Sequence, residues 1–160
     1  MVSVTLLVVG KLKESYWREA CAEYQKRMGS FCRLSVVEVE EYRLPDRPSP
    51  AQIQGGLEAE GKKLLQAIPQ GAWVCALCIE GKELSSPQLA ARLEQVTVGG
   101  KSQLVFVIGG SFGLSQQVKD RADLRLSISP MTFPHQLARV LVLEQLYRAF
   151  SINGGAKYHK

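Results

Sequence analysis

The chain has 160 residues, of which 46% are hydrophobic, and carries a formal net charge of +5. A chain of this length can bury about two-thirds of its unfolded surface, so we expect residues 1–160 to form a single domain that needs no disulfide bonds. No apolar run approaches the roughly 20 residues of a membrane span, and the positive charge mildly favours an anionic partner.

The cysteines and histidines argue against disulfide bonds and a metal site. The four cysteines are Cys21, Cys32, Cys75 and Cys78, and no apolar signal sequence precedes the first predicted strand, so we expect reduced thiols in the cytoplasm. Cys75 and Cys78 have C-x-x-C spacing but lie inside a predicted strand, where they point to opposite faces, which favours two buried core thiols. The two histidines lack an acidic cluster beside them, so no metal site is expected.

Strands and helices are predicted to alternate along the first half of the chain. A β-branched run over residues 2–9 predicts a strand, and apolar residues at helical spacing follow over residues 16–28. A second strand is predicted over residues 34–39. A helix over residues 53–65 follows a proline-rich loop, although three glycines weaken it.

The second half of the chain continues the same alternation. Strands are predicted over residues 73–79, 104–108 and 124–129. Ser86 is predicted to cap one helix and Ser115 another, and a last helix is predicted from about residue 135 to 150. This pattern predicts an α/β fold with a mainly parallel sheet covered by helices on both faces.

The last predicted helix has apolar residues on two sides. Val140, Leu143, Tyr147 and Phe150 form one stripe, and a second stripe contains Ala138, Val142 and Ala149. One sheet cannot cover both sides, which favours a helix at a homodimer contact made by Val140, Leu143 and Tyr147. The alternative is a helix sunk deep in the core of its own chain.

Two loops at predicted strand ends are the candidate binding site. Gly109-Gly110-Ser111-Phe112-Gly113 follows one strand and matches neither the dinucleotide fingerprint nor the phosphate-binding loop. Its glycines either let a ligand approach the main chain or serve a plain turn. The second loop, residues 129–135, is bounded by prolines and offers Met131 and Phe133 to pack a flat apolar ring. Adjacent loops of this kind suit an adenosyl ligand.

Longer motifs make the chain resemble one known family. Residues 107–114 read VIGGSFGL, residues 126–136 read LSISPMTFPHQ, residues 144–150 read EQLYRAF and residues 158–160 read YHK. Together with VGKLK at residues 9–13, these segments resemble the ribosomal RNA large subunit methyltransferase H family over essentially the whole chain.

The resemblance implies a SPOUT-class fold with a C-terminal trefoil knot, S-adenosylmethionine as the cofactor, and methylation of N3 of a pseudouridine in the helix 69 loop of 23S ribosomal RNA. It also implies a homodimer that acts on the assembled ribosome. The cofactor-binding positions that it implies are Leu77, Gly109, Ile128, Ser129, Pro130, Met131, Thr132 and Phe133. The tail residues Tyr158, His159 and Lys160 would come from the partner subunit to meet the RNA.

The residues suit methyl transfer, because an activated donor leaves the enzyme mainly to position two reactants. The acceptor imide must lose a proton, and either His159 or water could take it. Tyr158 can stack on the base, and Lys157 and Lys160 can bind phosphate. Arg139 could face the RNA, the cofactor carboxylate or solvent.

Three other functions remain open on the sequence alone. A SPOUT enzyme with another RNA target would share the cofactor loops but lack the Tyr-His-Lys tail. A ribosome assembly factor would bind RNA without S-adenosylmethionine, and a flavodoxin-like domain would bind a nucleotide cofactor without RNA.

Overall fold

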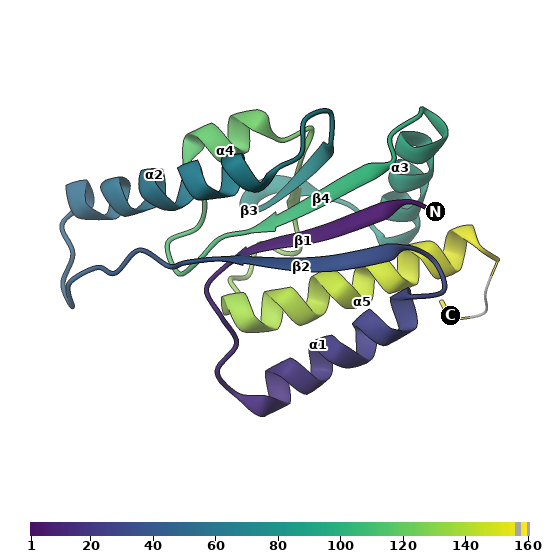
Figure 1. Cartoon of the computed structure of the whole chain (residues 1–160), viewed down its shortest axis with the longest axis horizontal. Coiled ribbons are helices and arrows are strands. Elements are labelled where there is room, and N and C mark those ends of the chain that lie inside the picture. Colours follow the sequence, from purple (N-terminus) through teal and green to yellow (C-terminus); the bar gives the residue numbers. More distant parts are fainter. Residues whose placement is uncertain (156–157, 160) are drawn as a thin grey trace.

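A computed structural model describes residues 1–155 and 158–159. Strands and helices alternate from one end to the other, as the sequence predicts (Figure 1). The elements are β1 (Ser3–Val9), α1 (Ser15–Met28), β2 (Arg33–Val39), α2 (Pro50–Ala67), β3 (Trp73–Glu83), α3 (Ser86–Val98), β4 (Gln103–Ile108), α4 (Gln116–Arg121), β5 (Leu124–Ser127) and α5 (His135–Asn153).

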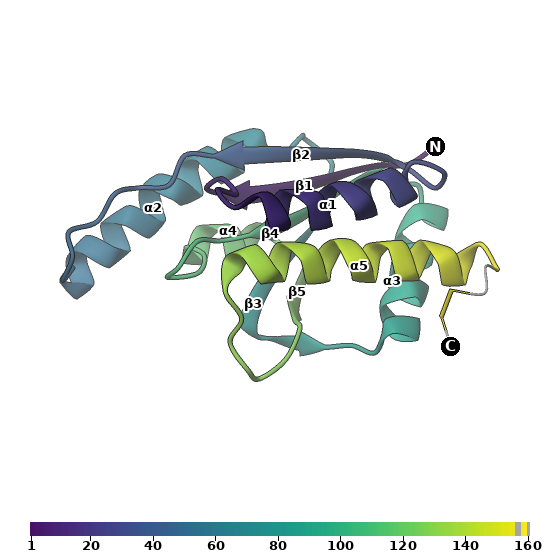
Figure 2. The same cartoon turned by 90° about the horizontal axis from the view of Figure 1, so that it is seen from below.

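The five strands form one parallel sheet in the order β2-β1-β4-β3-β5. Side chains of a strand alternate between the two faces, so β1 sends Leu6 and Val8 into one core and Leu7 and Val9 into another. The first core is closed by α1, α3 and α5, and the second by α2 and α4 (Figure 2). The predicted α/β class with helices on both faces is confirmed.

Serine side chains cap three of the helices. Ser49, Ser85 and Ser115 accept hydrogen bonds from the backbone N–H three residues later, and the first two form full capping boxes. The predicted cap at Ser115 is confirmed, whereas the cap at Ser86 is wrong by one residue. Ser85 takes that position because Gln88 lies three residues after it and bonds back to its N–H. The Ser86 hydroxyl donates instead to Gln145 of α5 at 2.6 Å.

β3 is longer than predicted and β5 is shorter. Beyond Leu77 the register between β3 and β5 shifts, so that Leu126 pairs with both Leu77 and Lys82. The two backbones approach closely there, because a Cβ atom on Gly81 would lie 2.7 Å from the carbonyl carbon of Leu126. The close approach fastens the distal part of β3 to β5, and the trefoil knot implied by the resemblance stays an expectation.

Both predicted apolar stripes of α5 pack into the chain's own core, which supports the alternative of a helix sunk deep in that core. Leu143 is fully buried in the chain's own core, and Val140, Tyr147 and Phe150 pack against that core. A dimer contact through Leu143 is therefore wrong. The half-buried side chains of Leu137 and Leu141 belong to neither core cluster, so they form the outward apolar stripe of this helix.

Candidate active site

A cleft of about 870 Å³ lies where β4 and β5 end beside the middle of β3. β3 lies between β4 and β5 in the sheet, so the loops that follow β4 and β5 flank residues 77–80 of β3 at one edge. The first turn of α5 closes the cleft. Its walls are formed by residues 77–80, 108–114, 126–129 and 131–136 together with Lys119 and Ala138.

The cleft brings together most of the predicted cofactor-binding residues. Those that line it are Leu77, Gly109, Ile128, Ser129, Met131, Thr132 and Phe133. Pro130 lies in the same loop but does not line the cleft. The structure thus gathers residues as far apart in the sequence as Leu77 and Phe133, while their binding of a cofactor stays a prediction.

The glycine loop after β4 is folded tightly on itself. Gly113 donates its N–H to the carbonyl of Gly110 at 3.1 Å and has a φ of 88°, which glycine adopts without strain. A Cβ atom on Gly109 would lie 2.6 Å from the carbonyl carbon of Gly113. The turn itself therefore requires glycine at position 109. The other predicted reason for glycine here, the close approach of a ligand to the main chain, stays a prediction.

The loop after β5 is held by its own serines. The Ser127 hydroxyl donates to the carbonyl of Ser129 at 3.0 Å, and the Ser129 hydroxyl accepts from the N–H of Met131 at the same distance. Pro130 and Pro134 further restrict the backbone. The loop thus has a fixed shape, which lowers the entropic cost of binding a ligand.

Large apolar side chains stand exposed around the cleft. Ile79, Phe112, Ile128 and Met131 line it and are 53%, 51%, 39% and 73% exposed. Exposed apolar side chains that converge on one cleft are typical of binding sites. Ile79 and Phe112 were missed in the sequence, although both follow the buried part of a strand at the edge where ligands bind.

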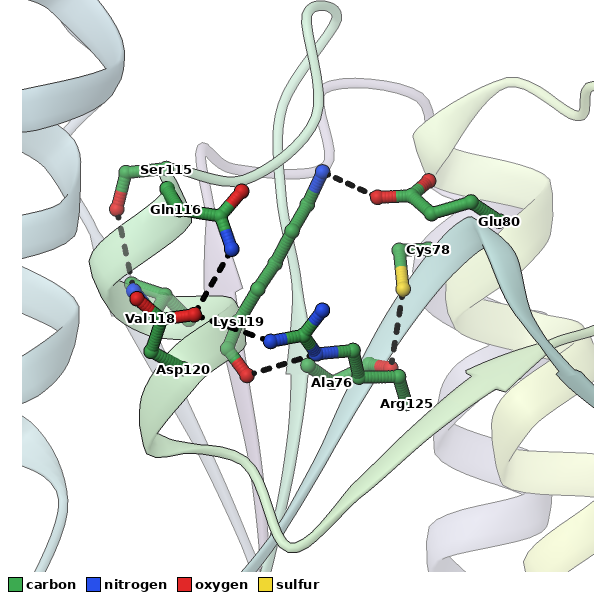
Figure 3. A network of polar contacts seen from close by, with 9 residues as sticks. All are labelled: Ala76, Cys78, Glu80, Ser115, Gln116, Val118, Lys119, Asp120 and Arg125. Atoms are coloured by element: carbon green, nitrogen blue, oxygen red, sulfur yellow. Dashed lines mark hydrogen bonds and ion pairs between the residues drawn. The ribbon is translucent and has the colours of Figure 1, made fainter.

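A polar network forms another wall (Figure 3). Lys119 of α4 donates to Glu80 on the distal part of β3, and this bond lowers the pKa of Glu80. Arg125 bonds both Asp120 and the carbonyl of Lys119, which fastens α4 to β5. The ion pair lines the cleft and places both charges beside any bound ligand. It was missed because its partners lie far apart in sequence.

The cysteine and histidine of the cleft are held uncharged. The sequence predicts that both Cys75 and Cys78 are core thiols. Cys75 is fully buried, but Cys78 is half-buried and lines the cleft, so the prediction is wrong for Cys78. Burial raises the pKa of the Cys78 thiol, which makes it a poor nucleophile. Burial lowers the pKa of His135 at the start of α5, so its imidazole is neutral at pH 7.

Arg139 does not line the cleft. Its side chain is buried, and its guanidinium donates to Glu38 at 2.8 Å and to the carbonyl of Gly10 at 3.2 Å. The predicted alternative that the Arg139 side chain extends to solvent is therefore wrong. Both bonds direct the guanidinium to the ends of β1 and β2. A catalytic role for Arg139 stays a prediction.

The tail lies at the other end of α5 from the cleft. The helix has 19 residues, which corresponds to about 28 Å, and the cleft contacts its first turn. Tyr158 and His159 lie beside Tyr147 and Arg148 near its last turns. The predicted RNA-binding residues Lys157 and Lys160 lie outside the described residues.

Comparisons with known proteins agree with this geometry. A family model described as a predicted SPOUT methyltransferase matches residues 2–159. The chain belongs to the SPOUT methyltransferase family. The resemblance seen in the sequence is thus confirmed, and the SPOUT methyltransferase fold accounts for the cleft at the edge of a parallel sheet.

Individual relatives of this SPOUT methyltransferase align with almost the whole chain. Proteins named ribosomal RNA large subunit methyltransferase H from Bifidobacterium adolescentis, Ligilactobacillus salivarius and Clostridioides difficile are 47%, 46% and 45% identical, and each alignment covers 99% of this chain and 100% of the relative. A solved structure of a probable methylase family protein from Haemophilus influenzae matches the fold with a TM-score of 0.53 at 16% identity, covering 98% of this chain and 70% of that one.

Membrane-spanning helices and clusters of metal ligands are both absent from the described residues. No helix among them is long and apolar enough to cross a membrane. Residues 1–155 and 158–159 contain no group of three or more histidine, cysteine, aspartate or glutamate side chains arranged to hold a metal ion.

Proposed function

We propose that this methyltransferase transfers a methyl group from S-adenosylmethionine to N3 of a pseudouridine in the helix 69 loop of 23S ribosomal RNA. The observation that carries the proposal is the cleft between two rigid loops at the ends of β4 and β5, in a chain of the SPOUT methyltransferase family. The names of the full-length relatives support a ribosomal RNA substrate.

The cleft suits an adenosyl group. Ile128 and Met131 on one loop and Phe112 on the other offer apolar surface to a flat purine ring. Backbone groups of the two loops would form hydrogen bonds with its edge. The bound cofactor would supply a methyl group activated by its sulfonium, and the residues of the cleft would fix the direction of transfer.

The acceptor nucleotide would be held by the tail. Tyr158 would stack on the base, His159 would contact the base edge, and Lys157 and Lys160 would supply positive charge for phosphate. Because Tyr158 lies at the end of α5 far from its own cleft, the tail would serve the cleft of a second subunit. This arrangement requires a homodimer, and Leu137 and Leu141 provide an outward apolar stripe for its contact.

Titration calorimetry with S-adenosylmethionine tests the cofactor, and transfer of a radiolabelled methyl group to ribosomes that lack this modification tests the substrate. We expect micromolar cofactor binding and one methyl group per ribosome, mapped to N3 of the pseudouridine by mass spectrometry of the RNA. Binding without transfer would indicate another RNA target. RNA binding without cofactor binding would indicate an assembly factor, and either result would overturn the proposal.

A matched pair of variants locates the cofactor. Met131→Asp places a charge in the apolar wall and should abolish cofactor binding, whereas Val98→Asp on the exposed side of α3 should leave it unchanged. Equal affinity of both variants would place the cofactor outside the cleft.

A further inference from the structure

Arg148 is the centre of a cluster at the end of α5, formed by Glu144, Tyr147, Arg148, Tyr158 and His159. Its Nη1 atom lies 3.0 Å from Nδ1 of His159, and its guanidinium carbon lies 4.8 Å from the centre of the Tyr158 ring. That ring meets the ring of Tyr147 edge to face at 4.7 Å. Arg148 thus touches both described residues of the tail.

The guanidinium is fixed before it meets the tail. Glu144, one turn earlier, accepts from Nε of Arg148 at 2.7 Å, and the two side chains are only 16% and 24% exposed. The neighbouring cation, Arg27 of α1, lies over the rings of Tyr24 and Tyr147. The bond from Nε to the Glu144 carboxylate orients Arg148, so that its Nη1 atom is directed at Nδ1 of His159.

The chemistry of this contact decides where the histidine carries its proton. A guanidinium has only N–H donors and no acceptor, so Nδ1 of His159 must accept the hydrogen bond with its lone pair. The imidazole is then neutral with its hydrogen on Nε2. A protonated ring would direct an N–H at an N–H and place two cations together.

We propose that Arg148 is a positioning residue that holds His159 as the neutral Nε2–H tautomer, so that the tail presents a hydrogen-bond donor, and not a proton acceptor, to the RNA base. This inference rests on the proposed function for the identity of the base. Nothing in the resemblance of the chain to its family assigns this role to Arg148.

The donor would act on a carbonyl oxygen of the uracil-type ring next to N3. When N3 loses its proton to water, negative charge spreads onto that oxygen, and a donated hydrogen bond stabilises it. The N3 lone pair then forms a bond to the methyl carbon, the bond from carbon to sulfur breaks, and its electron pair returns to sulfur. His159 lowers the energy of the anion without changing its own protonation.

The tautomer is measurable on the free dimer by nitrogen-15 and carbon-13 NMR of the imidazole rings. The chain has only two histidines, so a spectrum of His135→Gln assigns the signals. We expect His159 to show a single tautomer protonated on Nε2. Arg148→Met should give a mixture of tautomers, and the matched control Arg27→Met should keep the wild-type pattern. A proton on Nδ1, or identical spectra for wild type and Arg148→Met, would overturn the proposal.

Methylation of ribosomes separates a donor from a base. Glutamine keeps an N–H donor but cannot take a proton, so His159→Gln should stay within about tenfold of wild type, while His159→Ala should lose about 10²-fold in rate. Equal loss in both variants would favour a general base and contradict the proposal. If wild type methylates no ribosome, the proposed function fails, whereas the tautomer pattern of the free protein would still stand.

Discussion

Arg139 in the first turns of α5 donates a hydrogen bond to Glu38 of the edge strand β2 across 2.8 Å. Arg139→Met should lower the free energy of unfolding by about 2 kcal/mol, because the bonds to Glu38 and to the Gly10 carbonyl are both lost. The Glu38 side chain is one-third exposed, so it can regain water and limit the loss. Urea unfolding measures the difference.

Lys63→Met is the control for Arg139. The contact of Lys63 with Glu40 is long, at 3.9 Å, and lies in solvent, so its loss should cost less than about 0.5 kcal/mol. Equal losses in the free energy of unfolding for the two variants would show that the bonds of Arg139 stabilise the fold no more than the solvent-exposed contact of Lys63.

Gly109→Ala should distort the loop after β4, because a Cβ atom there would collide with the carbonyl group of Gly113. We expect the variant to fold and to lose at least about tenfold in affinity for S-adenosylmethionine, equivalent to about 1.4 kcal/mol. Calorimetry measures the affinity, and circular dichroism checks the sheet.

Gly55→Ala is the matched control. Gly55 is exposed on α2, and a Cβ atom there meets nothing within 4 Å. This variant should bind the cofactor as wild type does and gain up to about 1 kcal/mol in stability from helix propensity. An unchanged affinity in Gly109→Ala would mean that the loop adapts or that the cofactor lies elsewhere.

The sequence predicts the order of elements and the place of the cleft because both depend on local pattern. β-branched runs alternate with helical periodicity, and the carboxyl ends of parallel strands meet at one edge. The contacts that cross the chain could not be predicted. Arg139 stands among apolar residues, and its partner Glu38 is 101 positions away. The distal part of β3 contains Gly81 and charged residues that resemble a turn, and only pairing with β5 makes it a strand.

Glu60 should make stability depend on pH. It lies buried beneath the loop after β2, where it accepts the N–H of Tyr42 at 2.9 Å, and burial raises its pKa above the ordinary value. The folded state therefore binds this proton more tightly than the unfolded state. The contribution to stability is fully present below the unfolded pKa of about 4.3 and is lost as pH rises through the folded pKa.

Glu60→Gln should consequently be more stable than wild type at pH 7, because the amide oxygen still accepts from Tyr42 without a buried charge. The advantage should shrink as pH falls toward 4. Urea unfolding at several pH values measures it, with Glu58→Gln on the exposed side of the same helix as control. An advantage independent of pH would contradict the role of ionisation.

Leu141→Glu should convert a dimer into folded monomers if the outward stripe of α5 forms the contact. Burying an unpaired carboxylate costs at least about 3 kcal/mol, which raises the dissociation constant by about 10²-fold. Leu143→Glu should instead unfold the chain, because Leu143 is fully buried in its own core. Sedimentation and circular dichroism distinguish these outcomes. A wild-type monomer at micromolar concentration would remove the dimer hypothesis.

Mixed dimers should show whether one subunit completes the site of the other. Tyr158 and the cleft lie at opposite ends of α5, so a tail cannot serve its own cleft unless the chain rearranges. A subunit that lacks residues 158–160 keeps a working cleft, and a subunit with Gly109→Val keeps a working tail. Neither homodimer should methylate ribosomes, although the tail-deleted one should bind S-adenosylmethionine with wild-type affinity.

The heterodimer of these two subunits contains one intact cleft opposite one intact tail. Separately tagged chains allow its purification, and its methylation rate should be about half that of wild type if the tail acts across the dimer, because one of two composite sites is complete. If the tail served its own cleft, each subunit would carry one defect, and the heterodimer would be as inactive as its parents. Full activity of the tail-deleted homodimer would exclude Tyr158 and His159 from the reaction altogether.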